Sequence, residues 1–207
     1  MAELTSFLQH VPGAPDHLQV YVIFFHDLGE HPRTYAEAKT LSRELTKQAL
    51  ADATGCSPTD MVLPPGPPYL VDGTCRYSLS RTTEAMALSI STVGERTGID
   101  IEQLQTKDQA EQLIKVFHAA DQRRLRTRLP GRRRPHPRKV TQAWTYKEAL
   151  LKGLEVGLVR DPATDEIGSL KKPLTPQGWS LTPIPIANDR GHIASVAWET
   201  TPCSVQD

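Results

Sequence analysis

The same order of structural signals occurs twice along the 207 residues, and this repetition limits the fold more than any single motif does. Residues 18–26 form a run of β-branched, aromatic and other apolar side chains, which is typical of a strand buried on both faces. A helix is predicted over 33–54, because small and apolar residues recur there every three or four positions. Short strands are predicted to follow around 76–80, 85–91 and 99–102. The first half is therefore predicted to be a strand, a helix and then further strands.

The second half is predicted to follow a similar order. Helices are predicted over 107–117 and 141–154, after the strand at 99–102. Weaker strand signals then occur near 167–170, 179–184 and 192–198. No residue-level repeat accompanies this similarity of order. The mixture of helices and strands predicts an α+β fold.

Composition excludes several classes of protein. Hydrophobic residues make up 38% of the chain and charged residues 23%, so the chain has enough apolar mass for a core and is not disordered throughout. No stretch approaches the roughly 18 consecutive apolar residues of a membrane helix, and the N-terminus lacks the pattern of a secretory signal. Cys56, Cys75 and Cys203 are odd in number and widely spaced, which argues against a disulfide framework or a zinc cluster. We therefore expect a cytoplasmic protein with reduced thiols that does not bind membranes.

Positive charge is concentrated in residues 123–139, although the chain as a whole carries no net charge. This stretch holds nine basic residues and no acidic one, whereas the rest of the chain has 15 basic and 24 acidic residues. Pro130, Pro135 and Pro137 forbid a continuous helix, so we predict a mobile cationic loop. Such a loop could be a solvated insertion or could bind nucleic acid, although it lacks the interleaved aromatic residues of a base-stacking platform.

Two carboxylates, Asp100 and Glu102, lie two positions apart in the strand predicted at 99–102, so both project from one face. Neighbouring carboxylates repel each other and raise each other's pKa unless a cation lies between them. A hard divalent ion such as Mg²⁺ suits this arrangement, because it prefers oxygen ligands and leaves room for water and phosphate. The alternative is an edge strand whose polar face lies in water.

A second polar cluster lies on the helix predicted over 141–154. Glu148 and Lys152 are four residues apart and share one face, and Trp144 lies one turn before Glu148 on the same stripe. This pattern is compatible with a catalytic face. It is equally compatible with a surface helix whose ion pair is anchored by a buried tryptophan.

Together, the two segments resemble the signature of the 4′-phosphopantetheinyl transferases, specifically the larger surfactin-synthetase-activating type. The pattern G-I-D-I-E is followed 42 residues later by W-x-x-K-E-A-x-x-K. The residues at the motif positions are Gly98, Asp100, Glu102, Trp144, Lys147, Glu148, Ala149 and Lys152. Weaker similarities to the family are found at residues 66–69, 77–82, 117–125 and 192–198.

The resemblance implies a pseudo-twofold arrangement of two similar halves, 1–95 and 96–207, with the active site in the cleft between them. It also implies an enzyme that transfers the 4′-phosphopantetheine arm of coenzyme A to a serine of an apo acyl or peptidyl carrier protein. The reaction requires Mg²⁺ and releases adenosine 3′,5′-bisphosphate. Coenzyme A and the carrier protein are then the expected partners, and we expect a monomer that does not bind nucleic acid.

The resemblance also implies specific roles. Asp100, Glu102 and Glu148 would be metal ligands, and Glu148 is also the candidate base for the serine hydroxyl. Lys152 would face the pyrophosphate and stabilise the leaving group, with Lys147 as a second phosphate contact. The further expected coenzyme A contacts are Ser80, Arg81, Pro68, Arg33 and Arg43.

Two positions depart from the family pattern. Pro67 stands where the family has a lysine that touches the nucleotide, and Arg81 stands where it has a histidine that touches the pyrophosphate. Arginine keeps a positive charge and a hydrogen-bonding fork, so phosphate binding is compatible with Arg81. The departures leave open a degenerate relative that binds carrier protein without turnover.

The family resemblance adds a third interpretation of residues 123–139. In the family, the region between the two motifs docks the carrier protein, whose recognition helix is typically acidic. A cationic loop would steer such a partner and raise the association rate. A protein that binds nucleic acid through its arginine-rich loop remains the alternative from another functional class.

Overall fold

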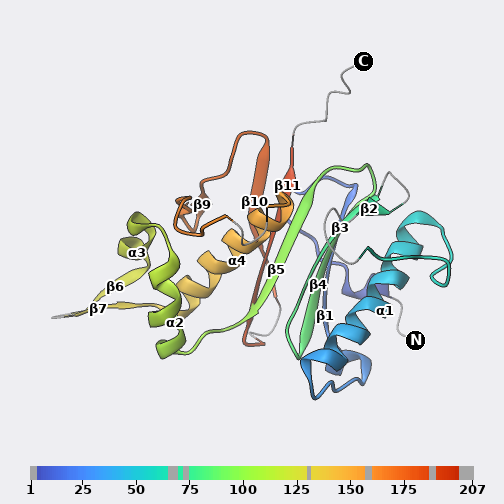
Figure 1. Ribbon diagram of the computed structural model, residues 1–207, viewed down its shortest axis with the longest axis horizontal. Coiled ribbons are helices and arrows are strands. Elements are labelled where there is room, and N and C mark those ends of the chain that lie inside the picture. Colours follow the sequence, from blue (N-terminus) through green and yellow to red (C-terminus); the bar gives the residue numbers. More distant parts are fainter. Residues whose placement is uncertain are drawn as a thin grey trace.

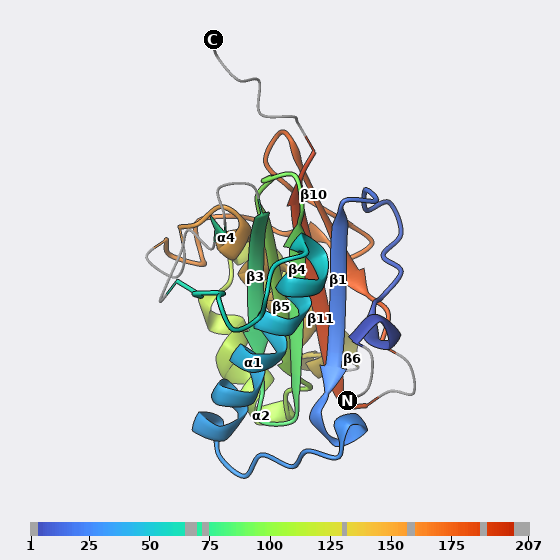
Figure 2. The ribbon, with the colours of Figure 1, turned by 90° about the vertical axis from the view of Figure 1, so that its right-hand side faces the viewer.

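Two antiparallel sheets lie face to face, and a long helix covers the outer face of each (Figure 1, Figure 2). The computed structural model describes residues 4–64, 70–71, 75–129, 132–156, 160–186 and 190–200. Within these ranges, no helix combines the length and the apolar character needed to cross a membrane. The predicted α+β class is confirmed.

The first sheet has the strand order β1–β4–β3–β2 and is covered by helix α1. Its elements are β1 (Leu18–Phe24), α1 (Tyr35–Thr54), β2 (Leu70–Val71), β3 (Cys75–Arg81) and β4 (Ala85–Ser91). Thr34 caps the start of α1, since its hydroxyl accepts a hydrogen bond from the Glu37 amide at 3.2 Å. The helix ends at Gly55, whose φ of 73° favours glycine. These boundaries agree with the predicted helix at 33–54.

The second sheet repeats this arrangement with the order β10–β11–β5 and is covered by helix α4. Its elements are β5 (Thr97–Gln103), α4 (Pro137–Gly153), β10 (Trp179–Ile184) and β11 (His192–Glu199). In each half, the first strand pairs with the last strand, and the last strand pairs with the one before it. The similar order predicted for the two halves is therefore a repeated topology.

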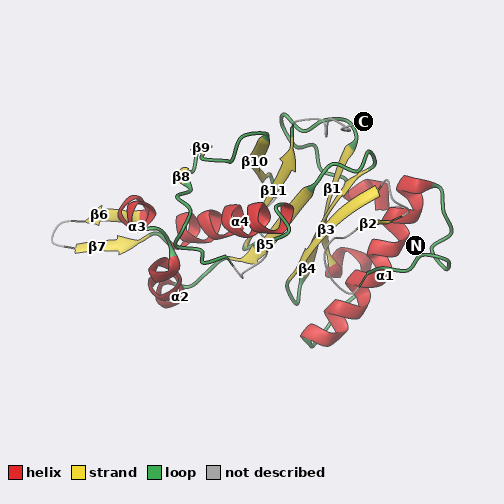
Figure 3. Ribbon diagram, turned by 45° about the horizontal axis from the view of Figure 1, so that its top comes forward, coloured by secondary structure: helices red, strands yellow, loops and turns green. Residues whose placement is uncertain are grey.

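A shared core fills the space between the two sheets. Its buried members include Leu18, Val20, Val22, Phe24, Ala85 and Ala87 from the first sheet, with Ile99, Ile101, Ile184, Ala194, Val196 and Trp198 from the second. Because successive side chains of a strand alternate between its faces, the residues between these core positions point outward. On β5 that outward face carries Gly98, Asp100 and Glu102, and α4 lies against it (Figure 3).

Shorter elements complete the second half. Helix α2 (Lys107–Leu113) begins with a capping box formed by Thr106 and Gln109 and continues into a 3₁₀ turn, so the predicted helix at 107–117 is confirmed over most of its length. The 3₁₀ turns are Leu4–Phe7, Phe25–Leu28 and Ile114–Val116, and the short strands β8 (Gly168–Ser169) and β9 (Lys172–Pro173) pair with each other.

The prediction of a loop over 123–139 is wrong for the residues that the structure describes. This segment ends helix α3 (Ala119–Leu125), forms a hairpin of β6 (Arg126–Leu129) and β7 (Arg132–Pro135), and begins α4. Pro137 is the first residue of α4, where its missing N–H removes no helical hydrogen bond. Pro135 is the last residue of a strand in a two-stranded ribbon, where proline is tolerated. The hairpin projects from the end of the molecule opposite α1 (Figure 1, Figure 3).

Candidate active site

Strand β5 and helix α4 pack with their backbones in direct contact. A Cβ atom added at Gly98 would overlap the carbonyl oxygen of Ala149 and the backbone of Gly153. A Cβ atom at Gly153 would in turn overlap the ring of Trp179. The small residues at these positions therefore allow α4 to lie close enough to β5 for their polar side chains to meet.

The polar side chains that meet are three carboxylates and one ammonium group. Asp100 is 2% exposed, and its Oδ1 accepts a hydrogen bond from Lys152 Nζ at 2.7 Å. The same oxygen accepts a hydrogen bond from the hydroxyl of Ser80, on β3 of the other sheet, at 2.8 Å. Glu102 and Glu148 are close enough to Asp100 for its charge to affect both of them. The structure thus brings Ser80, Asp100, Glu102, Glu148 and Lys152 together where the two halves meet.

Burial and mutual repulsion shape the electrostatics of this group. Burial, followed by the charge of Asp100, raises the pKa of Glu102 to about 7, although Lys152 and a hydrogen bond from Trp144 oppose the shift. Burial and the charge of Asp100 also raise the pKa of Glu148. One ammonium group faces three carboxylates, so this cluster of side chains can accommodate additional positive charge.

Two carboxylate oxygens of this group are buried without any hydrogen-bond partner among the described residues: Asp100 Oδ2 and Glu148 Oε1. Unpartnered buried oxygens are costly, and their chemistry suits a hard divalent cation. Across the described ranges, no three histidine, cysteine, aspartate or glutamate side chains are already grouped as ligands of one ion. Lys152 Nζ lies against Asp100 instead. The residues therefore fit a divalent cation by donor type and charge.

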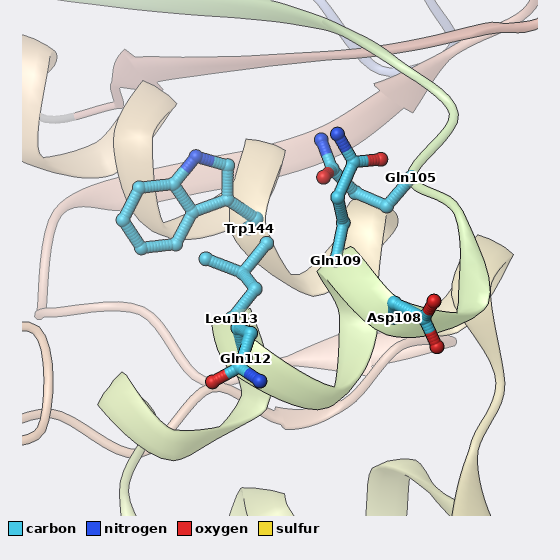
Figure 4. Close-up of a pocket in the computed structure, with 6 residues that line it drawn as sticks. All are labelled: Gln105, Asp108, Gln109, Gln112, Leu113 and Trp144. Carbon is cyan, nitrogen blue, oxygen red and sulfur yellow. The ribbon is translucent and has the colours of Figure 1, made fainter.

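Trp144 connects the carboxylates to a hollow on the surface. Its indole lies close enough to Glu102 to lower the pKa of that carboxyl, and it packs edge-on against Phe117, with ring centroids 6.0 Å apart. Figure 4 shows the indole beside side chains of α2, at a cavity of about 550 Å³. The cavity is lined by Gln105, Asp108, Gln109, Gln112, Leu113 and Trp144. Trp144 therefore lies between Glu102 and this open hollow, to which it contributes its side chain.

The structure does not place the predicted phosphate-binding arginines beside the carboxylates. Arg81 follows Ser80 on β3 and therefore points to the opposite face, toward α1. Its guanidinium carbon lies 5.9 Å from the centre of the Tyr35 ring, and its buried Nε has no partner among the described residues. Arg33 is exposed just before α1, and Arg43 is half-buried on that helix. Pro67 and Pro68 lie outside the described residues.

Lys147 also lies apart from the carboxylates. Its Nζ donates hydrogen bonds to the backbone carbonyls of Pro162 and Asp165, the latter at 2.6 Å. The side chain is 4% exposed, and burial lowers its pKa. In this structure Lys147 anchors the segment after α4, whereas Glu148 and Lys152 face β5.

The sequence-based predictions missed three features of the site. They did not identify the hydrogen bond from Ser80 to Asp100 or the place of Tyr35 over Arg81. They also missed the role of Gly153, although a glycine four residues after Ala149 is a signal for close helix packing. Ser80 and Asp100 lie on different strands, so no local sequence pattern connects these two hydrogen-bonded residues.

Comparison with known proteins gives one finding. Residues 96–184 match the family model of the 4′-phosphopantetheinyl transferase superfamily. A comparison with curated proteins gave no match. The matched residues run from the start of β5 to the end of β10 and include all three carboxylates and the whole of α4. The match covers less than half of the chain; it makes this region similar to the 4′-phosphopantetheinyl transferase superfamily and supports phosphopantetheinyl transfer as the type of reaction.

Proposed function

We propose that this protein transfers the 4′-phosphopantetheine arm of coenzyme A to a serine of an apo acyl or peptidyl carrier protein, as enzymes of the surfactin-synthetase-activating type do. The observation that carries the proposal is the group of three carboxylates on β5 and α4, two of whose buried oxygens have no partner among the described residues and lie beside Lys152. This group lies within the residues that match the transferase superfamily. A phosphoryl-transfer enzyme needs cation-binding carboxylates and positive charge in the same place.

Asp100, Glu102 and Glu148 would hold the divalent cation, with Mg²⁺ the expected ion. When bound, the cation would neutralise negative charge on the phosphate oxygens of coenzyme A. The unpartnered oxygens of Asp100 and Glu148 are the natural first ligands, because each lacks any other partner among the described residues. Glu102 would bind in its ionised form, which its raised pKa makes dependent on pH.

Glu148 is the proposed general base. Burial raises its pKa, which brings the carboxylate closer to the basicity that proton transfer near neutral pH requires. Glu148 takes the proton from the hydroxyl of the carrier serine, and the serine oxygen forms a bond to the β-phosphorus of coenzyme A. The bond from this phosphorus to the oxygen shared with the α-phosphate breaks, and adenosine 3′,5′-bisphosphate leaves with that electron pair.

Lys152 is the proposed partner of the leaving group. Its ammonium group lies 2.7 Å from Asp100 Oδ1, next to the site where the pyrophosphate would lie. The flexible four-carbon side chain allows the ammonium group to contact a phosphate oxygen while its backbone stays fixed on α4. Its fixed charge would stabilise the negative charge that develops on the departing α-phosphate.

The nucleotide end of coenzyme A is proposed to lie along the first half, over β3 and the start of α1. Arg81 supports this placement, because its Nε is buried and has no partner among the described residues. Arg33 lies just before α1 and Arg43 lies on that helix, and both would supply further positive charge. The two halves, 1–95 and 96–207, would then divide the binding of coenzyme A between them.

The carrier protein is proposed to dock over α2 and the β6–β7 hairpin. Trp144 lines the cavity (Figure 4) and also lies close to Glu102, so a serine presented there is proposed to reach the carboxylates. The hairpin is tied to α2 by an ion pair between Arg126 and Glu111, with 3.6 Å between nitrogen and oxygen. The excess of arginine in 123–139 would attract an acidic carrier helix.

The proposal is tested by incubating the protein with coenzyme A, Mg²⁺ and a panel of apo carrier proteins and measuring intact masses. We expect at least one carrier to gain the mass of the phosphopantetheine arm, and Asp100→Asn to abolish this gain while remaining folded. Glu44→Gln, at an exposed position of α1, is the matched control and should keep full activity. Binding of carrier without any mass gain would instead identify a degenerate relative, and the proposal would be wrong.

A further inference from the structure

We infer that Ser80 is a positioning residue that decides which oxygen of Asp100 is presented to the cation. The inference rests on the proposed function, since it concerns the same carboxylate group. It changes the role expected for Ser80 from a contact with coenzyme A to a contact with a metal ligand. It also makes the first half of the chain part of the metal site.

The two oxygens of Asp100 have very different surroundings. Oδ1 accepts two hydrogen bonds, from Ser80 Oγ at 2.8 Å and from Lys152 Nζ at 2.7 Å. Oδ2 is buried and accepts none from the described residues. A carboxylate held by two donors on one oxygen cannot rotate freely, so the other oxygen keeps a fixed direction. That oxygen is therefore the one left to bind a cation.

Ser80 reaches Asp100 because of the way the two sheets meet. β5 is the outermost strand of its sheet, and its free edge lies beside β3 of the other sheet. Ser78 and Ser80 are two positions apart on β3 and share the face that points to β5. Ser78 Oγ accepts a hydrogen bond from the Ile99 amide at 3.1 Å, and Ser80 donates to the Asp100 carboxylate.

The two serines thus make similar contacts with different consequences. Both are almost fully buried, at 2% and 8% exposure, and both join β3 to β5. Ser78 satisfies a backbone N–H and holds the strand in place. Ser80 binds the side chain of a proposed metal ligand, and such outer partners typically change metal affinity by about 10–100-fold when they are removed. Ser78 is therefore a natural control for Ser80.

The test measures Mn²⁺ binding by electron paramagnetic resonance, with the full-length, metal-free protein in the absence of coenzyme A. We expect Ser80→Ala to raise the Mn²⁺ Kd by about 10–100-fold, whereas Ser78→Ala, checked for folding by its thermal midpoint, leaves it nearly unchanged. Ser80→Cys keeps the side-chain volume with a weaker donor and should also raise the Kd. It serves as the test if the alanine variant does not fold.

Coenzyme A binding, measured by calorimetry without metal, separates the two roles of Ser80. We expect Ser80→Ala to bind coenzyme A as the wild type does. Weakened coenzyme A binding with unchanged Mn²⁺ binding would overturn the inference and make Ser80 a substrate contact. An equal loss of Mn²⁺ affinity in the Ser78 and Ser80 variants would also overturn it, because the serines would then act only by joining the strands. If the wild-type protein transfers phosphopantetheine without binding Mn²⁺, the inference is overturned but the proposed function stands. If the wild-type protein neither binds Mn²⁺ nor transfers phosphopantetheine, both are overturned.

Discussion

The two halves of the molecule share a topology but pack against their covering helices in different ways. α1 lies on the first sheet through large, fully buried side chains that include Ile23, Leu50 and Leu88. α4 lies on β5 at Gly98 and Gly153, where the backbones are too close for any larger side chain. Large side chains bury more apolar surface, whereas close backbone contact brings the polar groups of strand and helix together. The same arrangement of elements can therefore serve mainly as a scaffold in one half and as a reaction site in the other.

The charged side chains of the site are also divided unequally between the two halves. Asp100, Glu102, Glu148 and Lys152 all belong to the second half, on the two elements in closest contact. The first half contributes the hydroxyl of Ser80 to this group. The comparison predicts that changes at the β5–α4 contact abolish activity and that equivalent changes around α1 mainly affect stability.

The largest effect is expected from closing the space between β5 and α4. Gly98→Ala should lower the free energy of unfolding by about 3 kcal/mol and abolish transfer, because the new methyl group overlaps the α4 backbone. Gly55→Ala in the first half is the matched control. Gly55 has a φ of 73° and open space around it, so we expect a loss of about 1 kcal/mol and full activity.

Chemical denaturation gives the stability of both glycine variants, and the carrier-protein mass assay gives their activity. A Gly98→Ala variant with wild-type activity would show that the backbone contact is not what assembles the site. The contrast between the two halves would then have no functional meaning.

The next largest effect is expected at the proposed base. Glu148→Gln should reduce kcat by about 10²–10⁴-fold, because an amide cannot accept the serine proton. The variant should be at least as stable as the wild type without metal, since it removes a half-buried carboxyl that repels Asp100. The matched change Glu44→Gln, on the exposed side of α1, should leave both quantities unchanged. Steady-state kinetics and thermal unfolding of the three proteins provide the measurement.

The sequence predicts which site residues lie together only when these residues share one helix or strand or belong to a known sequence motif. Asp100 and Glu102 alternate with core residues on β5, and Glu148 and Lys152 are one turn apart on α4, so their shared faces were predictable. The contact between Ser80 and Asp100 joins two different sheets, and it depends on packing that no local pattern specifies.

Other differences had local signals that could have been used. Lys147 is adjacent to Glu148 on a helix, where successive residues point about 100° apart, so both cannot face the same site. Arg81 is adjacent to Ser80 on a strand, where neighbours point to opposite faces. The prolines of 123–139 excluded one continuous helix, but they did not exclude a hairpin followed by a helix that begins at proline.

A smaller effect concerns pH and Glu102 in the metal-free protein. Burial and the charge of Asp100 raise its pKa from 4.5 to about 7 on folding, so the folded state holds this proton more tightly than the unfolded state. The resulting stability is fully present below pH 4.5 and is lost as the pH rises through 7, with a total of about 1–3 kcal/mol. Thermal unfolding between pH 5 and 8 should show this loss in the wild type and a smaller one in Glu102→Gln. An identical pH profile in both proteins would show that Glu102 is not the group responsible.

The smallest effect is expected at the β6–β7 hairpin, which projects from the second half and has no counterpart among the described residues around α1 (Figure 1). Replacing Arg132, Arg133 and Arg134 by serine should raise the KM for carrier protein by roughly 3–10-fold at low salt, because long-range attraction mainly affects the association rate. The KM for coenzyme A should stay the same, since the proposed nucleotide contacts lie on the first half.

Salt dependence distinguishes docking from a direct contact with the nucleotide. Screening by added salt should raise the carrier KM of the wild type toward that of the triple variant, because the Debye length falls to about 3 Å at 1 M. Replacing Lys39 and Lys47 on α1 by serine is the control in the other half, and we expect it to leave the carrier KM unchanged. If the triple variant instead raises the KM for coenzyme A alone, the hairpin acts as a nucleotide clamp. The division between a first half that binds the nucleotide and a second half that binds the carrier would then be wrong.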